Sequence, residues 1–185
     1  MSLRRVQIVI LCEDRQQEVF ARYFLKKRGF TGKIRVNCCP PGSQSAEQYV
    51  RTQYPVEVKA YRQNKNRVSI GLVVLIDADK ETSKQHFKEL EDALENDSQQ
   101  NRQSDEAIAI FVPKRNIETW IDYLRDYKNV NEEDEYLKFT KNEASCKPDV
   151  GKLAERCRSQ DLPKNAPPSL KNACEELQRL LLLLG

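Results

Sequence analysis

Residues 68–79, VSIGLVVLIDAD, decide the fold that this chain is expected to adopt. Residues 68–76 are β-branched or apolar apart from Ser69 and Gly71, which is typical of a strand buried on both faces of a parallel sheet. The run ends abruptly in Asp77, Ala78 and Asp79. If the strand continued through these residues, Asp77 and Asp79 would point the same way.

Three other apolar runs are predicted to be strands, and helical patterns separate them. The strands are expected at residues 5–11, 33–37 and 107–112. The helices are expected at residues 16–28, at 45–64 with a kink or a new start at Pro55, at 82–96, and from about Asn116. Alternating strands and helices predict a three-layer, Rossmann-like α/β domain with a mainly parallel sheet over residues 1–127.

Residues 128–185 contain no convincing strand and are predicted to form a helical extension packed on the α/β domain. A short helix is expected at residues 150–157 and a longer one from about Ser169. The longer helix carries an apolar stripe typical of a packing helix: Leu170, Ala173, Cys174, Leu177, Leu180, Leu181 and Leu184. Leu182 and Leu183 widen this stripe, so a homo-oligomer contact through the Leu-rich helix is an open alternative.

Composition excludes several classes of protein. The chain has 185 residues, and its longest apolar runs are far shorter than the ~20 residues of a membrane-spanning helix. The first residues, MSLRR, lead into a strand-like run rather than a signal peptide, so we expect a cytoplasmic protein without a membrane partner. The six cysteines form no C-x-x-C motif, and reduced thiols are the default expectation. With His86 as the only histidine, Ser-His-Asp and Cys-His catalysis are disfavoured.

Charge is unevenly distributed, although its net value is only +3. Residues 1–67 carry a net charge of +9, and residues 68–185 carry −6. This division suits a protein that holds a polyanion on one face and a metal ion on another. An unevenly charged solvated surface would give the same composition.

Acidic residues follow two of the predicted strands. Glu13 and Asp14 come directly after the first strand, as Asp77 and Asp79 come after the central one. Ligands of open α/β sheets bind beyond the carboxyl ends of the strands, so Glu13, Asp77 and Asp79 are expected to bind metal together. Carboxylates suit Mg²⁺ or Mn²⁺, which serve phosphoryl transfer. The alternative is that these acids only begin loops and cap helices.

Basic residues adjoin the same strand ends. Lys80 and Lys84 follow the Asp77–Asp79 segment, and Lys114 and Arg115 follow the fourth predicted strand. These four are candidate phosphate-binding residues for a nucleic acid, which would be held without sequence specificity. The alternative is that they are ordinary surface side chains.

The order of a strand with Glu13, a helix, a strand, a helix, and a strand with Asp77 and Asp79 resembles the Toprim domain. Topoisomerases, bacterial primases, recombination proteins and OLD-type nucleases share that domain. The sequence is most similar to small stand-alone OLD-like proteins, through EDRQQEVF at residues 13–20 and IETWI at residues 117–121. The resemblance implies a parallel α/β fold and a Mg²⁺ site on Asp77 and Asp79. It also implies a Glu13 that binds metal or transfers a proton, and it adds Glu118 to the catalytic candidates.

Two residues depart from the pattern of these OLD-like proteins. Asp14 replaces a glycine, and Gln17 replaces an acid, which removes a ligand for a second metal ion. Hydrolysis with two metal ions then requires Asp14, Glu18 or Glu118 to compensate.

The leading hypothesis is a Mg²⁺-dependent (or Mn²⁺-dependent) nuclease that hydrolyses phosphodiester bonds of DNA or RNA, with a place in anti-phage defence. The first alternative is a non-catalytic, Toprim-like, nucleic-acid-binding subunit of a larger complex with an ATPase partner. The second is a phospho-acceptor domain similar to response regulators. The position of the acid pair after the third predicted strand disfavours the second alternative.

Overall fold

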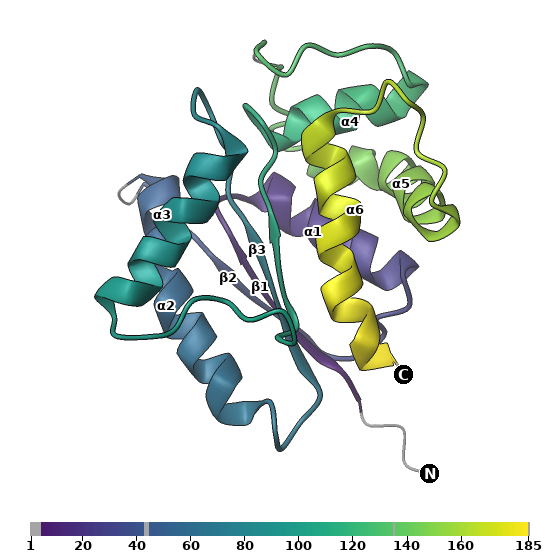
Figure 1. Cartoon of the computed structure of the whole chain (residues 1–185). Coiled ribbons are helices and arrows are strands. Elements are labelled where there is room, and N and C mark those ends of the chain that lie inside the picture. Colours follow the sequence, from purple (N-terminus) through teal and green to yellow (C-terminus); the bar gives the residue numbers. More distant parts are fainter. Residues whose placement is uncertain (1–4, 43–44, 135, 185) are drawn as a thin grey trace.

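The computed structural model describes residues 5–42, 45–134 and 136–184 (Figure 1). In these residues four strands form one parallel sheet in the order β2-β1-β3-β4. The strands are β1 (Gln7–Cys12), β2 (Ile34–Cys38), β3 (Ile70–Leu75) and β4 (Ile108–Phe111). The predicted α/β class is confirmed, and the layout is consistent with a Rossmann-like arrangement.

Helices cover both faces of the sheet. One face carries α2 (Ala46–Asn64) and α3 (Ser83–Asn96), and the other carries α1 (Arg15–Lys27) and α6 (Pro168–Leu181), as Figure 1 shows. Two further helices, α4 (Ile117–Asp126) and α5 (Lys147–Ser159), lie on the same side as α1 and α6. Short 3₁₀ turns at Glu143–Cys146 and Leu182–Leu184 precede α5 and follow α6. Because β1 and β3 lie between β2 and β4, both are buried along most of their length.

Local sequence explains where the helices begin. The side chain of Asp14 accepts a hydrogen bond from the N–H of Gln17 at 2.9 Å and caps α1. Thr82 caps α3 in the same way, through the N–H of Gln85 at 3.1 Å. Pro55 does not divide the second predicted helix, because α2 runs through it from Ala46 to Asn64. The missing N–H of a proline costs one helical hydrogen bond, and the packing of α2 on the sheet outweighs that loss.

The C-terminal helix is part of the layer on one face of the sheet. Leu170, Leu177 and Leu180 of α6 are fully buried, whereas Leu182 beyond the helix is 79% exposed. One continuous hydrophobic core includes residues on both sides of position 127, such as Trp120 and Leu177. Most of the apolar stripe predicted for this helix is therefore used inside the chain.

A disulfide joins α5 to α6, which differs from the expectation of reduced thiols. It links Cys157 to Cys174, whose Cα atoms lie 5.5 Å apart, within the range that a disulfide spans. A separation of 17 residues in the sequence does not indicate that these two cysteines pair, because only the fold brings the two helices together.

Glu176 of α6 protects the outer edge of β4. Its Oε2 accepts a hydrogen bond from the N–H of Ile110 at 2.8 Å, and the same carboxylate pairs with Arg102. Arg102 in turn donates to the carbonyl of Ile108 at 2.9 Å. Side chains therefore satisfy backbone groups of an edge strand that would otherwise be open to pairing with another chain.

Replacing Glu176 by alanine is expected to lower the free energy of unfolding by about 2 kcal/mol, because the N–H of Ile110 and the guanidinium of Arg102 both lose a charged partner. Urea denaturation measures this change. Glu175, an exposed neighbour on the same helix, provides the control, and Glu175→Ala should leave the midpoint nearly unchanged. Equal midpoints for the two variants would show that Glu176 does not anchor β4.

Candidate metal centre

The loops that follow β1 and β3 meet at the carboxyl end of the sheet, because these two strands are neighbours. Glu13 Oε1 accepts a hydrogen bond from the backbone N–H of Asp77 at 2.5 Å. The N–H of Glu13 donates to Gln17 Oε1 at 2.8 Å. Two acids 64 residues apart in sequence are thus in direct contact, and a buried glutamine fixes the backbone of one of them.

Asp77 is one of two buried carboxylates of this region, together with Glu118. Its side chain is buried, and its Oδ1 makes no hydrogen bond with any described residue. Burial raises the pKa of Asp77 well above its usual range, and the negative charges of Glu13, Asp14 and Glu118 raise it further. Gln17 opposes this shift but does not cancel it.

Two other carboxyl groups are shifted in the same direction. Burial raises the pKa of Glu13 to about 8; the hydrogen bond from Asp77 opposes this shift, and the charges of Asp79 and Asp14 add to it. Burial also raises the pKa of Glu118, in the first turn of α4, to about 7, with a contribution from Asp14. Glu13, Asp14, Asp77, Asp79 and Glu118 are called the acidic rim below, because their charges act on one another.

Carboxylates gathered in this way can be neutralised by protons or by a cation. Asp77 Oδ1 is buried and makes no hydrogen bond of good geometry with a described residue, although the Gln17 side chain lies close enough to lower the pKa of Asp77, and the ligand set is made entirely of carboxylates. Hard divalent ions such as Mg²⁺ and Mn²⁺ prefer such oxygens. The residues present therefore fit a hard divalent cation held by Glu13 and Asp77.

Asp79 lies differently from Asp77. Because β3 ends at Leu75 and Asp79 adopts a left-handed backbone with φ of 49°, the strand does not continue through the acid pair. Asp77 is buried and Asp79 is exposed. The expectation that both point the same way was conditional on a continuing strand, and that condition is not met.

A short antiparallel bridge joins the loops after β3 and β4. The N–H of Asp79 donates to the carbonyl of Arg115 at 3.0 Å, and the N–H of Ala78 donates to that of Pro113 at 2.8 Å. Arg115 is also left-handed, with φ of 65°. Two adjoining residues other than glycine in this sparsely populated region indicate a strained loop pair, a feature that clusters at functional sites.

The four basic candidates have different surroundings. Arg115 and the exposed Lys80 line a hollow of about 310 Å³ together with Asp79 and Glu47, and Arg115 Nε makes no hydrogen bond with a described residue. Lys114 forms an ion pair with Glu133, so its charge is already compensated. Lys84 is exposed in the first turn of α3.

Sequence reasoning did not assign site roles to Glu47 and Lys138, and it named Asp14 only among the acids that could compensate for the ligand missing at position 17. Asp14 lines a hollow of about 200 Å³ together with Glu118 and Lys138, and the charge of Lys138 lowers the pKa of Glu118. Asp14 was noticeable as the acid beside Glu13. Lys138 lies in a loop without a motif, so no sequence signal pointed to it.

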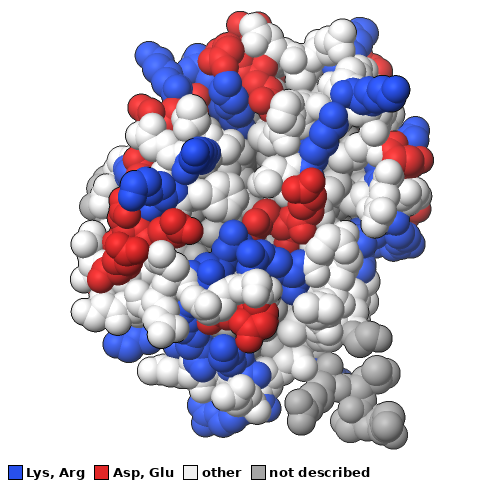
Figure 2. All heavy atoms as spheres, viewed as in Figure 1, with Lys and Arg blue, Asp and Glu red and all other residues white. Residues whose placement is uncertain are grey.

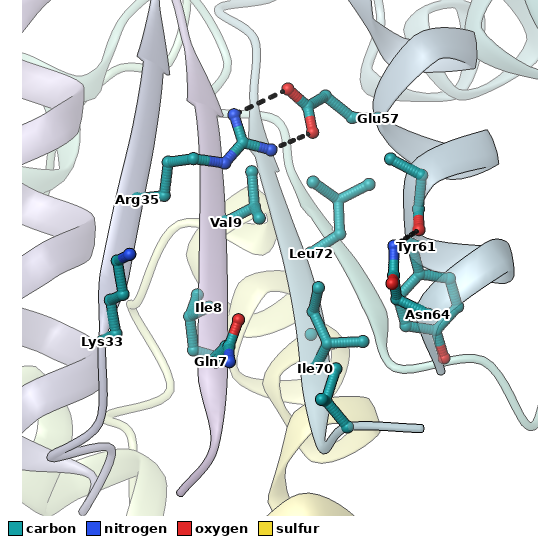
Figure 3. A pocket seen from close by; sticks show the side chains of 13 residues that line it. Gln7, Ile8, Val9, Lys33, Arg35, Glu57, Tyr61, Asn64, Ile70 and Leu72 are labelled. Atoms are coloured by element: carbon teal, nitrogen blue, oxygen red, sulfur yellow. Dashed lines mark hydrogen bonds and ion pairs between the residues drawn. The ribbon is translucent and has the colours of Figure 1, made fainter. Parts of the chain in front are cut away.

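A separate hollow of about 410 Å³ lies on the α2 side of the sheet (Figure 3). Figure 3 shows Arg35 of β2 and Glu57 of α2 facing each other across it, joined by hydrogen bonds of 3.2 and 2.7 Å. The apolar residues Ile8, Val9 and Leu72 contribute to its wall. Its charged groups are largely paired, so it does not share the uncompensated charge of the acidic rim.

Comparisons of the chain with protein-family models, with curated proteins and with solved structures gave no match. Among the described helices, none combines the length and the apolar character that a membrane crossing requires.

Proposed function

We propose that this protein hydrolyses phosphodiester bonds of DNA or RNA with Mg²⁺ or Mn²⁺ held at the acidic rim. The observation that carries the proposal is the contact between Glu13 and Asp77, in which a buried aspartate lies against a glutamate of raised pKa and keeps one oxygen without a hydrogen bond to the described residues. Burying several carboxylates together is unfavourable unless protons or a cation compensate them. A bound divalent ion would compensate the negative charge of these carboxylates.

Each member of the acidic rim has a distinct role in this proposal. Glu13 and Asp77 hold the ion, and the exposed Asp79 lies on the open side. When bound, the ion polarises phosphate oxygens and promotes ionisation of water. Glu118, with a pKa of about 7, is suited to transferring a proton near neutral pH. The roles of Glu13 and Asp77 agree with those that the Toprim resemblance implies, whereas Asp79, which the resemblance makes a metal ligand, is not assigned as one in this proposal.

Arg115 and Lys80 are proposed to contact the phosphate backbone, because they line the hollow beside Asp79. Such contacts give affinity without sequence specificity. Figure 2 shows that acidic and basic side chains are interspersed on the face drawn in Figure 1. A nucleic acid would then be held by a few local cations rather than by one broad basic surface on that face.

The purified chain is expected to degrade or nick labelled DNA or RNA when Mg²⁺ or Mn²⁺ is present and to stop when EDTA is added. Arg115→Gln should weaken binding of the substrate and reduce the slope of log K against log salt by about 1. Lys59 is the control, because it is exposed and lies in the C-terminal part of α2, whereas Glu47 lies at the start of that helix. Lys59→Gln should change neither the affinity for the substrate nor its salt dependence. Intact nucleic acids under all these conditions would contradict the proposal for the isolated chain.

The second candidate is a non-catalytic, nucleic-acid-binding subunit that acts with an ATPase partner, and Gln17 favours it. The Gln17 side chain is fully buried and accepts the hydrogen bond from the N–H of Glu13, so this position supplies no carboxylate. Leu182, which is 79% exposed, is an apolar side chain that a partner or a second copy could cover.

Gln17→Glu tests the importance of the missing carboxylate. The glutamate can keep the hydrogen bond from Glu13 and adds a charge beside Asp77, so we expect Mn²⁺ to bind about tenfold more tightly. The variant should also melt at a lower temperature in EDTA, because a further charge is buried. Gln178→Glu, at an exposed position of α6, should alter neither property. Unchanged Mn²⁺ affinity of Gln17→Glu would remove Gln17 from the metal centre.

A further inference from the structure

A second group of metal-ligand side chains lies on α2 and α3, outside the acidic rim. Glu47 of α2 and His86 and Glu89 of α3 each offer one donor atom, and these three atoms lie within 4.8 Å of one another. His86 and Glu89 are three residues apart, which places them on one face of the helix. Among the described residues, this is the one group of three such side chains whose donor atoms converge.

The imidazole of His86 is held in a fixed orientation. The side chain is 1% exposed, and its Nε2 lies 3.2 Å from the carbonyl oxygen of Ala78. A carbonyl oxygen only accepts, so Nε2 carries the proton. In a neutral ring the lone pair then belongs to Nδ1.

Nδ1 is directed at two carboxylates without a hydrogen bond to any described residue. It lies 3.1 Å from Glu89 Oε2 and 3.8 Å from Glu47 Oε1. Glu89 Oε2 is likewise buried, and its partner besides His86 is the guanidinium of Arg51 at 3.0 Å, with which it forms an ion pair but no hydrogen bond of good geometry. A bound cation, the guanidinium of Arg51 or a proton on Nδ1 can each compensate electron-rich atoms that face one another in this way.

The surroundings match those of a protein metal ligand. Histidines that bind metal usually donate the second ring N–H to a carbonyl or a carboxylate, as His86 does to Ala78. One imidazole and two carboxylates suit Zn²⁺ and related first-row ions. Glu47 also lines the hollow of about 310 Å³ beside Asp79, which offers an entry path for the ion.

Arg51 is the present counter-charge of this group. Its guanidinium lies 2.8 Å from Glu47 Oε1 and 3.0 Å from Glu89 Oε2, the same oxygens that face His86. A metal ion would therefore compete with Arg51 for these two carboxylates. Removing Arg51 should favour the ion.

We infer that Glu47, His86 and Glu89 form a transition-metal site that binds Zn²⁺, separate from the acidic rim. Through the hydrogen bond from His86 to Ala78, the bound ion would fix the loop that carries Asp77 and Asp79. The inference does not depend on nuclease activity, because it concerns a different set of ligands.

The test uses the full chain without a histidine tag, so that His86 is the only histidine in its spectrum. Long-range ¹H–¹⁵N NMR should show that one equivalent of Zn²⁺ shifts the Nδ1 resonance relative to the spectrum in EDTA, while Nε2 keeps its proton. Calorimetry should give one Zn²⁺ bound, and Asp77→Asn should retain that binding. A ring protonated at both nitrogens that Zn²⁺ leaves unchanged would overturn the inference.

Three variants sharpen the result. Glu89→Gln should weaken Zn²⁺ binding by at least about 10- to 100-fold. Loss of a residue that only hydrogen-bonds to a metal ligand typically has this effect, and loss of a ligand should have no smaller one. Glu91→Gln, at an exposed position of the same helix, should leave it unchanged. Arg51→Gln should tighten it. Equal Zn²⁺ affinities for all three variants and the wild type would overturn the inference. Circular dichroism is used to check that each variant is folded.

Discussion

Asp77→Asn is expected to lower metal-dependent cleavage about 1000-fold, because a divalent ion that stabilises the transition state by about 4 kcal/mol loses a buried ligand. The amide keeps nearly the same size and removes the charge that Glu13, Asp14 and Glu118 repel. In EDTA the variant should therefore be at least as stable as the wild type. Initial rates on labelled substrate and thermal unfolding in EDTA measure the two effects.

Asp92→Asn is the matched control for this prediction. Asp92 is half exposed on α3 and pairs with Lys88, so its loss should leave the cleavage rate unchanged and stability nearly so. A similar rate loss in both variants would point to a general structural effect. Full activity of Asp77→Asn would remove Asp77 from the catalytic centre.

The stability of the metal-free protein is expected to fall by about 3 kcal/mol or more as the pH rises from about 5 to 8. The pKa values of Glu13 and Glu118 are raised to about 8 and about 7 in the folded protein. Over this range the folded state binds more protons than the unfolded state, so the free energy of unfolding declines with increasing pH. Each pKa unit corresponds to about 1.4 kcal/mol. The pKa of Glu118 rises from 4.5 to about 7, and this shift alone accounts for the decrease of about 3 kcal/mol in the free energy of unfolding.

Mg²⁺ should reverse this decline. Fewer protons compete for the carboxylates of the acidic rim at pH 8 than at pH 6, so the increase in melting temperature on adding Mg²⁺ should be larger at pH 8. Glu118→Gln should flatten the pH profile in EDTA, and Glu175→Gln, at an exposed site on α6, should not. Stability that rises between pH 5 and 8 in EDTA would contradict the assigned burial of these carboxyl groups.

Much of the fold could be predicted from hydrophobic patterning. Residues 68–76 predicted the central strand because a strand buried on both faces needs a continuous apolar run, and β3 lies at the centre of the sheet. Thr82 predicted the start of α3, because its hydroxyl caps that helix. Strand ends also placed Glu13 and Asp77 together, because β1 and β3 are neighbours.

Other features depend on contacts that no local pattern encodes. The left-handed turn at Asp79 arises from its bridge to Arg115, a residue 36 positions away in the chain. Glu176 of α6 accepts a hydrogen bond from the N–H of Ile110 in β4, 66 residues earlier in the chain. Lys138 reaches Glu118 from a loop without regular structure. These contacts between distant segments decide which acids are enclosed and which are exposed.

The central claim is that the acidic rim binds a divalent ion. Anomalous diffraction from crystals soaked in Mn²⁺ tests it most directly, because Mn²⁺ can be located without reference to activity. We predict a peak within about 2.5 Å of carboxylate oxygens of both Glu13 and Asp77. An empty acidic rim at saturating Mn²⁺, with or without an ion at His86, would contradict the account.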